Sequence, residues 1–145
     1  MRVMVINGPN LDMLGYREPE VYGSKTYKDL CEYIQAAADR MQIEVEFYQS
    51  NYEGGIVEML HKVFMEKYDG VIVNAGAYTH YSYAIRDAIA ILSCPVVEVH
   101  ISDVMKREDF RKVSVIEEVC TTRRFGHGFD SYIEALEFVR SKCLK

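Results

Sequence analysis

Short apolar runs alternate with longer amphipathic stretches along most of this sequence. The runs at residues 2–7, 70–74 and 95–101 are rich in β-branched residues, as strands covered on both faces are. The stretch 26–41 instead repeats its apolar residues at helical spacing. Strands that alternate with helices pair in parallel and are joined by right-handed crossovers. The pattern therefore predicts an α/β fold.

The remaining elements complete a flavodoxin-like three-layer sandwich with a five-stranded parallel sheet. Thr26 and Asp29 form a capping-box-like start for the first long helix, and Asp130 is expected to cap the last one. We expect a single catalytic domain over residues 1–145. The expected elements are strand 2–7, helix 26–41, strand 43–49, helix 55–68, strand 70–74, helix 83–92, strand 95–101, a less distinct strand at 119–125 and helix 130–139.

Composition and charge exclude several classes of protein. The formal net charge is -5, which argues against a broad electrostatic grip on nucleic acid. No apolar stretch approaches the length of a membrane span. The cysteines form no CxxC pair and no metal-ligand spacing, and no secretory segment precedes them, so we expect reduced thiols in a cytoplasmic protein. The four cysteines are Cys31, Cys94, Cys120 and Cys143.

A long connection follows the first strand and carries polar residues. It runs over residues 8–25, whereas connections in α/β folds usually have roughly 2–6 residues. Arg17 and Tyr22 lie in it, and Gly15 and Gly23 are positioned where hinges of a lid would be. Length alone is equally compatible with an ordinary surface loop.

Other polar residues follow the third and fourth strands. Asn74 and His80 follow the third strand, and His100 and Ser102 lie at the end of the fourth. In open parallel sheets, ligands bind beyond the carboxyl ends of the strands, near the point where the strand order reverses. The sequence therefore predicts a site at this edge.

Two pairs in this set suggest proton transfer. Glu98 and His100 are two residues apart on a strand, so their side chains share a face. A carboxylate behind an imidazole fixes its tautomer and stabilises its protonated form, which suits a general acid. Arg17 lies near Tyr22 in the sequence, and a guanidinium beside a phenol favours the phenolate, which is a base. A buried ion pair and a packed tyrosine remain the alternatives without chemistry.

Better-known sites are missing. The sequence has no GxGxxG after the first strand, no P-loop, no HExxH and no GxSxG. A phosphate-accepting receiver domain needs acidic residues where this chain has Asn7 and Asn74. A metal site built on His80, Glu98 and His100 stays open, although no compact ligand motif supports it.

Four separated motifs follow one another along the chain: VINGPNLDMLGYREPEVYG, YQSNYEG, VIVNAGAYTHYSYAIRDA and PVVEVHISDVMKREDFR. Taken together, these segments resemble the type II 3-dehydroquinate dehydratases over essentially the whole chain. The family implies a flavodoxin-like fold and elimination of water from 3-dehydroquinate, without metal or cofactor.

The resemblance also implies roles for individual residues. Tyr22 is the base that takes a proton from C2, and Arg17 favours its phenolate and closes with the lid. Asn10 holds a water against the developing enolate. His100 protonates the departing C1 hydroxyl, and Glu98 backs its ring. The substrate-binding set is Asn74, His80, the Ile101 amide, Ser102 and Arg111.

Partners follow from the same resemblance. Asp87 matches a residue that reaches into the site of a neighbouring subunit, and the family assembles as trimers, usually four of them in a homododecamer. We expect the small anion 3-dehydroquinate as substrate, and neither nucleic acid nor membrane as a partner.

Some positions depart from the family pattern, none of them at an implied catalytic residue. They bear on the packing of the last strand, on affinity and on assembly. The departures are Asp12, Asp103-Val104-Met105, Thr122-Arg123-Arg124 and Ser131.

Three other functions compete with this one. The first is a flavodoxin-like binding module without catalysis. The second is a metal-dependent hydrolase or lyase that uses His80 and His100. The third is the same dehydration in quinate breakdown rather than in aromatic biosynthesis.

Overall fold

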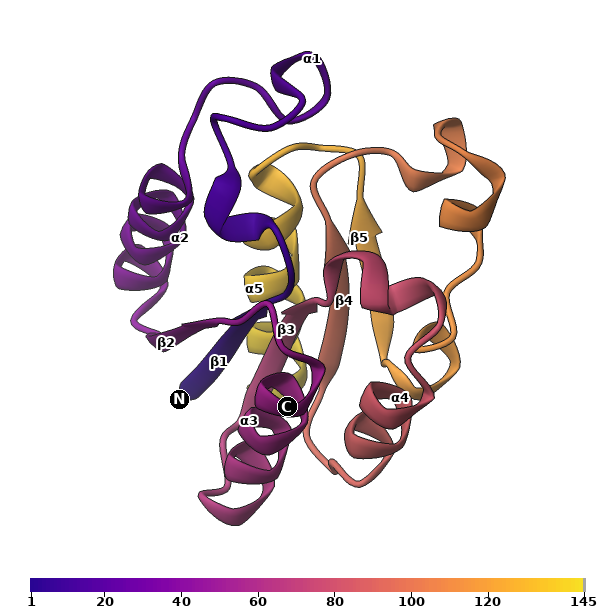
Figure 1. The fold of residues 1–145 in the computed structure, drawn as a ribbon. Coiled ribbons are helices and arrows are strands. Elements are labelled where there is room, and N and C mark those ends of the chain that lie inside the picture. Colours follow the sequence, from indigo (N-terminus) through magenta and orange to yellow (C-terminus); the bar gives the residue numbers. More distant parts are fainter. Residues whose placement is uncertain (145) are drawn as a thin grey trace.

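The computed structural model describes residues 1–144, with every side chain in that range except that of Tyr22. Its strands form one sheet of order β2-β1-β3-β4-β5, and all of the pairings are parallel (Figure 1). The predicted five-stranded sheet is therefore confirmed. The strand order reverses between β1 and β3. The strands are β1 (Arg2–Asn7), β2 (Glu44–Gln49), β3 (Gly70–Asn74), β4 (Val96–His100) and β5 (Thr122–Phe125).

Helices cover both faces of this sheet (Figure 1). One face packs against α2 and α5, and the other against α3 and α4. No helix in residues 1–144 combines the length and the apolarity that crossing a membrane requires. The helices are α1 (Pro19–Tyr22), α2 (Tyr27–Met41), α3 (Glu53–Met65), α4 (Tyr83–Ala90) and α5 (Asp130–Cys143). Short 3-10 turns are η1 (Leu11–Met13), η2 (Gly76–His80), η3 (Val104–Lys106), η4 (Asp109–Lys112) and η5 (Glu117–Val119).

The core consists of two apolar layers because successive residues of a strand point to opposite faces. Val3 and Val5 of β1 pack with α2 and α5. Met4 and Ile6 pack with α3 and α4. Burial on both faces explains why the central strands are apolar without interruption.

The predicted N-terminal cap is confirmed for α2 and is wrong for α5. The capping box of α2 is present, with Thr26 and Asp29 each accepting a hydrogen bond from the other's backbone nitrogen. The expected cap of α5 is wrong: Phe129 is the N-cap residue, and Asp130 is the first helical residue. The Asp130 carboxylate instead accepts a hydrogen bond from the Tyr33 hydroxyl of α2. It remains in the first turn, where the helix dipole favours negative charge.

The connection after β1 is anchored in its first half. Leu11 and Leu14 are buried in the core layer under α2 and α5. The long connection is therefore fixed to the core at residues 11–14. Gly15 and Gly23 have φ values of 91° and 80°, which only glycine adopts at little cost. We call the segment between these two glycines the lid.

Candidate active site

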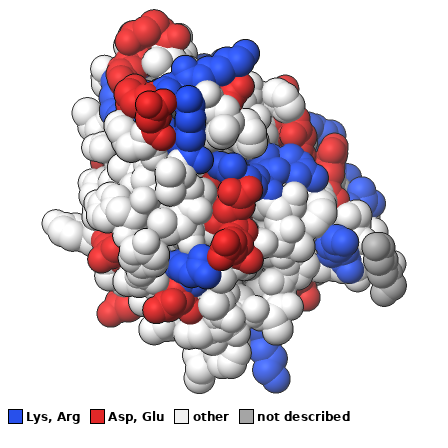
Figure 2. Space-filling view, turned by 90° about the vertical axis from the view of Figure 1, so that its right-hand side faces the viewer, with Lys and Arg blue, Asp and Glu red and all other residues white. Residues whose placement is uncertain are grey.

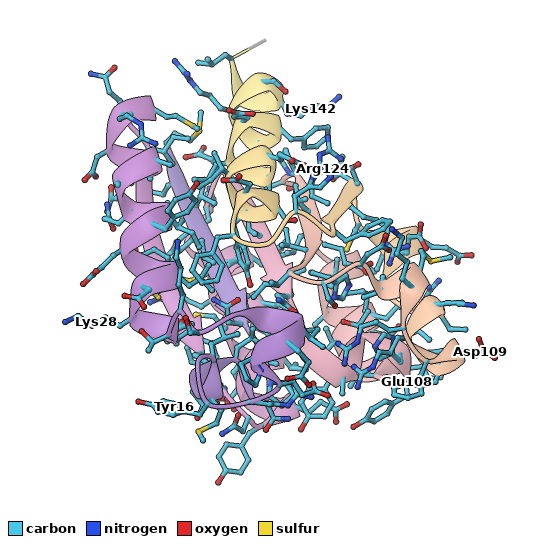
Figure 3. The ribbon with its side chains drawn as sticks, turned by 90° about the horizontal axis from the view of Figure 1, so that it is seen from above. Tyr16, Lys28, Glu108, Asp109, Arg124 and Lys142 are labelled. Atoms are coloured by element: carbon cyan, nitrogen blue, oxygen red, sulfur yellow. The ribbon has the colours of Figure 1, made fainter. Side chains whose placement is uncertain are left out.

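A pocket lies at the carboxyl edge of the sheet, between the lid and the chain that follows β4. Figure 3 looks down on this edge, with the lid at one side and the η4 segment, marked by Glu108 and Asp109, at another. Most of the predicted site residues converge there from separate elements. Including solvent at its mouth, the pocket encloses about 630 Å³. Its lining is Pro9, Asn10, Leu11, Leu14, Arg17, Asn74, Gly76, Ala77, His80, His100, Ser102, Val104, Arg107 and Arg111.

The imidazole of His100 is part of this lining, with a buried carboxylate behind it. Nε2 of His100 donates to Oε2 of Glu98 at 2.6 Å, as the spacing on the strand predicted. Oε1 of Glu98 accepts from the Ser114 hydroxyl at 2.8 Å. Burial opposes ionisation, but the hydrogen bond from His100 and the charges of His100 and Arg123 hold the pKa of Glu98 below its usual value. An anionic Glu98 therefore lies directly behind the imidazole of His100, which lines the pocket.

Three guanidinium groups line the pocket, each with a carboxylate beside it. Arg17 comes from the lid, whereas Arg107 and Arg111 come from the segment after β4. Oε2 of Glu18 lies 3.4 Å from Nη2 of Arg17 and 3.4 Å from Nη2 of Arg107, so it links the lid to that segment. Nη1 of Arg107 also donates to the Ser102 hydroxyl at 3.4 Å. Nε of Arg111 donates to Glu108 at 2.5 Å. No described residue that lines the pocket is a carboxylate.

Arg107 was missed from the sequence. It lies in an irregular segment that has no periodicity to orient its side chain. The available signal was its spacing of four from Arg111 just beyond a strand end. Its side chain is 11% exposed, which is unusual for an arginine without a function in binding or structure.

His80 is held in one orientation by the chain after η4. Its Nδ1–H donates to the Val113 carbonyl at 2.7 Å, and its ring packs edge-on against Phe110. Burial lowers its pKa below the usual value, so the neutral imidazole is favoured. The residues described include no group of three or more His, Cys, Asp or Glu side chains arranged to hold a metal ion.

The floor of the site is a buried hydrogen-bond chain that joins three elements. The Tyr132 hydroxyl of α5 donates to Asn7 Oδ1 of β1 at 2.6 Å. It accepts from Asn74 Nδ2 of β3 at 2.9 Å. Asn74 Oδ1 accepts from the Gly76 amide. Complete burial raises the pKa of Tyr132, so this hydroxyl stays neutral. The chain fixes the strand ends on either side of the point where the sheet order reverses.

The other predicted residues have different positions. Asn10 lies at the pocket with a left-handed backbone (φ 70°), and its backbone N–H donates to Asn51 Oδ1. Ile101 is buried in the core, and its peptide leads directly into Ser102. Asp87 is exposed on α4 and does not line the pocket of this chain. Tyr22 ends α1 inside the lid, and its side chain lies outside the described part of the structure.

One face of the molecule outside the sheet edge carries charges of both signs. Figure 2 shows the face to the right of Figure 1, where basic and acidic side chains intersperse without forming a large patch of one sign.

Known proteins resemble this chain over nearly its whole length. The family model described as "Dehydroquinase class II" matches residues 1–140. A 3-dehydroquinate dehydratase of Clostridium beijerinckii is 50% identical over 142 residues, covering 98% of this chain and 97% of that protein. One of Caldicellulosiruptor bescii is 52% identical over 135 residues, covering 93% of each. The crystal structure of a type II dehydroquinase from Butyrivibrio crossotus superposes with a TM-score of 0.95 at 47% identity, covering 97% of both chains.

Proposed function

This chain belongs to the class II dehydroquinase family, and we propose that its pocket removes water from 3-dehydroquinate with Tyr22 as base and His100 as acid. The protein is accordingly a 3-dehydroquinate dehydratase, a hydro-lyase. The product of the reaction is 3-dehydroshikimate.

The carrying observation is the pairing of His100 with Glu98 at the pocket wall. Elimination from a β-hydroxy ketone needs a base for the α-proton, stabilisation of an enolate and an acid for the leaving hydroxide. The buried carboxylate orients the imidazole at the pocket wall with a negative charge behind it, which suits the last of these tasks. Asn10 lines the pocket, where it would hold a water against the enolate oxygen.

The base belongs to the lid. Tyr22 ends α1, five residues after Arg17, whose guanidinium lines the pocket. In our proposal the positive charge of Arg17 favours the phenolate, which takes the proton from C2. Closing the lid would bring base and substrate together and exclude water from the enolate.

Charge supports an anionic substrate. The pocket has three arginines in a chain whose net charge is -5. The Ser102 hydroxyl and the adjoining Ile101 amide would hold the carboxylate. His80, Asn74 and Arg111 would hold the ring hydroxyls. A Schiff-base route would need a lysine, and no described residue that lines the pocket is one.

Cellular role and assembly complete the proposal. We assign the reaction to the shikimate pathway, in the cytoplasm, and the assembly to trimers grouped as a dodecamer. In such a trimer, Asp87 of one subunit would approach the site of the next.

The test is direct. Adding 3-dehydroquinate should produce an ultraviolet rise as the conjugated enone forms, and a chelator should leave the rate unchanged. Borohydride plus substrate should also leave it unchanged, because no imine forms. Loss of activity to the chelator would favour a metal enzyme, and loss to borohydride a Schiff base. Binding without any ultraviolet change would indicate a binding module.

A further inference from the structure

Arg123 brings a second cation to the carboxylate that supports His100. On the edge strand β5 it is the register partner of Glu98 on β4, so the two side chains emerge side by side. Its side chain is 14% exposed, and that of Glu98 is fully buried. A buried arginine on an edge strand has a high desolvation cost unless its charge is compensated.

One carboxylate oxygen lies next to both cations. Nη2 of Arg123 is 3.2 Å from Oε2 of Glu98, the oxygen that accepts the 2.6 Å hydrogen bond from His100. Nε and Nη2 of Arg123 are buried without a hydrogen-bond partner, so the contact with Glu98 is electrostatic rather than a well-aligned hydrogen bond. Nη1 of Arg123 lies 3.4 Å from the half-exposed Glu117.

The other groups around Glu98 are neutral, lie on the pocket side of His100 or are screened by water. The Ser114 hydroxyl donates to its second oxygen, and the neighbouring Cys120 has its pKa raised by burial, so it stays neutral. His80 and Arg111 lie on the pocket side of His100. Because Glu117 is half exposed, water screens its charge more than that of the buried pair.

Arg123 lowers the free-energy cost of releasing the proton of His100. Without Arg123, that release would leave a lone carboxylate in the protein interior, which is costly. With Arg123, the release leaves a neutral ion pair between Glu98 and Arg123. The same contact weakens the hold of Glu98 on the imidazolium, since the carboxylate charge is shared between two cations.

We propose that Arg123 is a positioning residue for this reaction, acting through Glu98 to make His100 a better proton donor. The proposal rests on the proposed function, because it assumes that His100 is the acid. It adds to that function a charge on β5 that never touches the substrate.

The experiment compares pH profiles of kcat and KM. Arg123→Met removes the charge, and Arg123→Gln removes it while keeping a donor near Glu98. In both, the alkaline limb of kcat, where the acid loses its proton, should shift upward by about one pH unit. The plateau kcat should fall by up to about tenfold, because a more tightly held proton transfers less readily. KM should stay unchanged. Arg123→Lys should restore much of the native profile.

Arg124→Met is the matched control. Arg124 is the next residue of the same strand, but it stacks on Phe138 of α5 and lies beside that helix in Figure 3. Its loss should leave both limbs in place, while thermal unfolding checks that each variant folds.

Two results would overturn the proposal. One is a folded Arg123→Met or Arg123→Gln enzyme with the native alkaline limb, and the other is an effect confined to KM. Native enzyme that fails to dehydrate 3-dehydroquinate would instead defeat the proposed function, so the two failures are distinguishable.

Discussion

Two side chains of this site are proposed to move protons, and others only hold charge. Tyr22→Phe and His100→Ala should therefore lower kcat by about 10²–10⁴-fold with little change in KM, because their loss falls on the transition state. Ser102→Ala should chiefly raise KM, since it would grip a carboxylate that is charged throughout the reaction. Steady-state kinetics of the three variants distinguishes the two classes.

A fourth variant tests whether Arg17 favours the ionised form of Tyr22. Arg17→Ala should resemble Tyr22→Phe in kcat, and its activity should need a higher pH because the phenol ionises less readily. Near-normal turnover by Tyr22→Phe would refute the assignment of the base. A native acidic limb in Arg17→Ala would refute the role of the guanidinium.

Glu98 also predicts how stability depends on pH. Its pKa in the folded protein is below the ordinary value, chiefly because the hydrogen bond and charge of His100 outweigh burial. Between the two pKa values the unfolded chain binds more protons, so stability rises with pH there. The contribution of Glu98 is present above about pH 4.3 and is lost as pH falls through the lowered pKa.

Glu98→Gln should therefore be less stable at neutral pH and should lose less of its stability on acidification. Urea unfolding midpoints of both proteins, measured across this pH range, check the prediction. The protein concentration is kept constant because assembly also affects apparent stability. Parallel midpoint curves for the native protein and Glu98→Gln would contradict the shift.

At the scale of elements, the lid should be mobile without ligand and ordered with it. The buried Leu11 and Leu14 limit the motion to the part between Gly15 and Gly23. Trypsin should cut after Arg17 in the free protein, and a carboxylate-bearing inhibitor should protect that bond. Equal cleavage in both conditions would rule out a lid.

The sequence pattern predicts some strands better than others. Central strands such as β3 were predicted to the residue, because burial on both faces leaves an uninterrupted β-branched run. The edge strand β5 was less distinct because Arg123 and Arg124 interrupt its apolar pattern. The convergence of Asn74 and His100 could be predicted because parallel strands end at one edge.

Other features depend on contacts that no local pattern records. Arg107 reaches the pocket from an irregular turn, and Asp130 is bonded to a tyrosine on another helix rather than capping its own. The Arg123–Glu98 contact depends on register between strands that lie far apart in the sequence. The roles of the individual site residues remain predictions.

At the scale of the whole molecule, we predict assembly through the surface that contains Asp87. Light scattering should show trimers or multiples of three. Asp87→Lys should lower activity and weaken assembly together, because the residue would serve the site of a neighbour. Asp39→Lys is the control, since Asp39 is exposed on α2, on the opposite face of the sheet. A fully active monomer would contradict the prediction.

The Tyr132 hydroxyl has a consequence for the order in which the protein becomes functional during synthesis. The ribosome makes β1 and β3 early and α5 after every other helix and strand described above. Domains generally fold as units, and here the strand ends beneath the pocket acquire their shared hydrogen-bond partner only when α5 docks. A nascent chain that already displays Asn7, Asn74 and His100 would thus remain inactive. Activity would begin only when α5 has left the ribosomal tunnel and packed against the sheet.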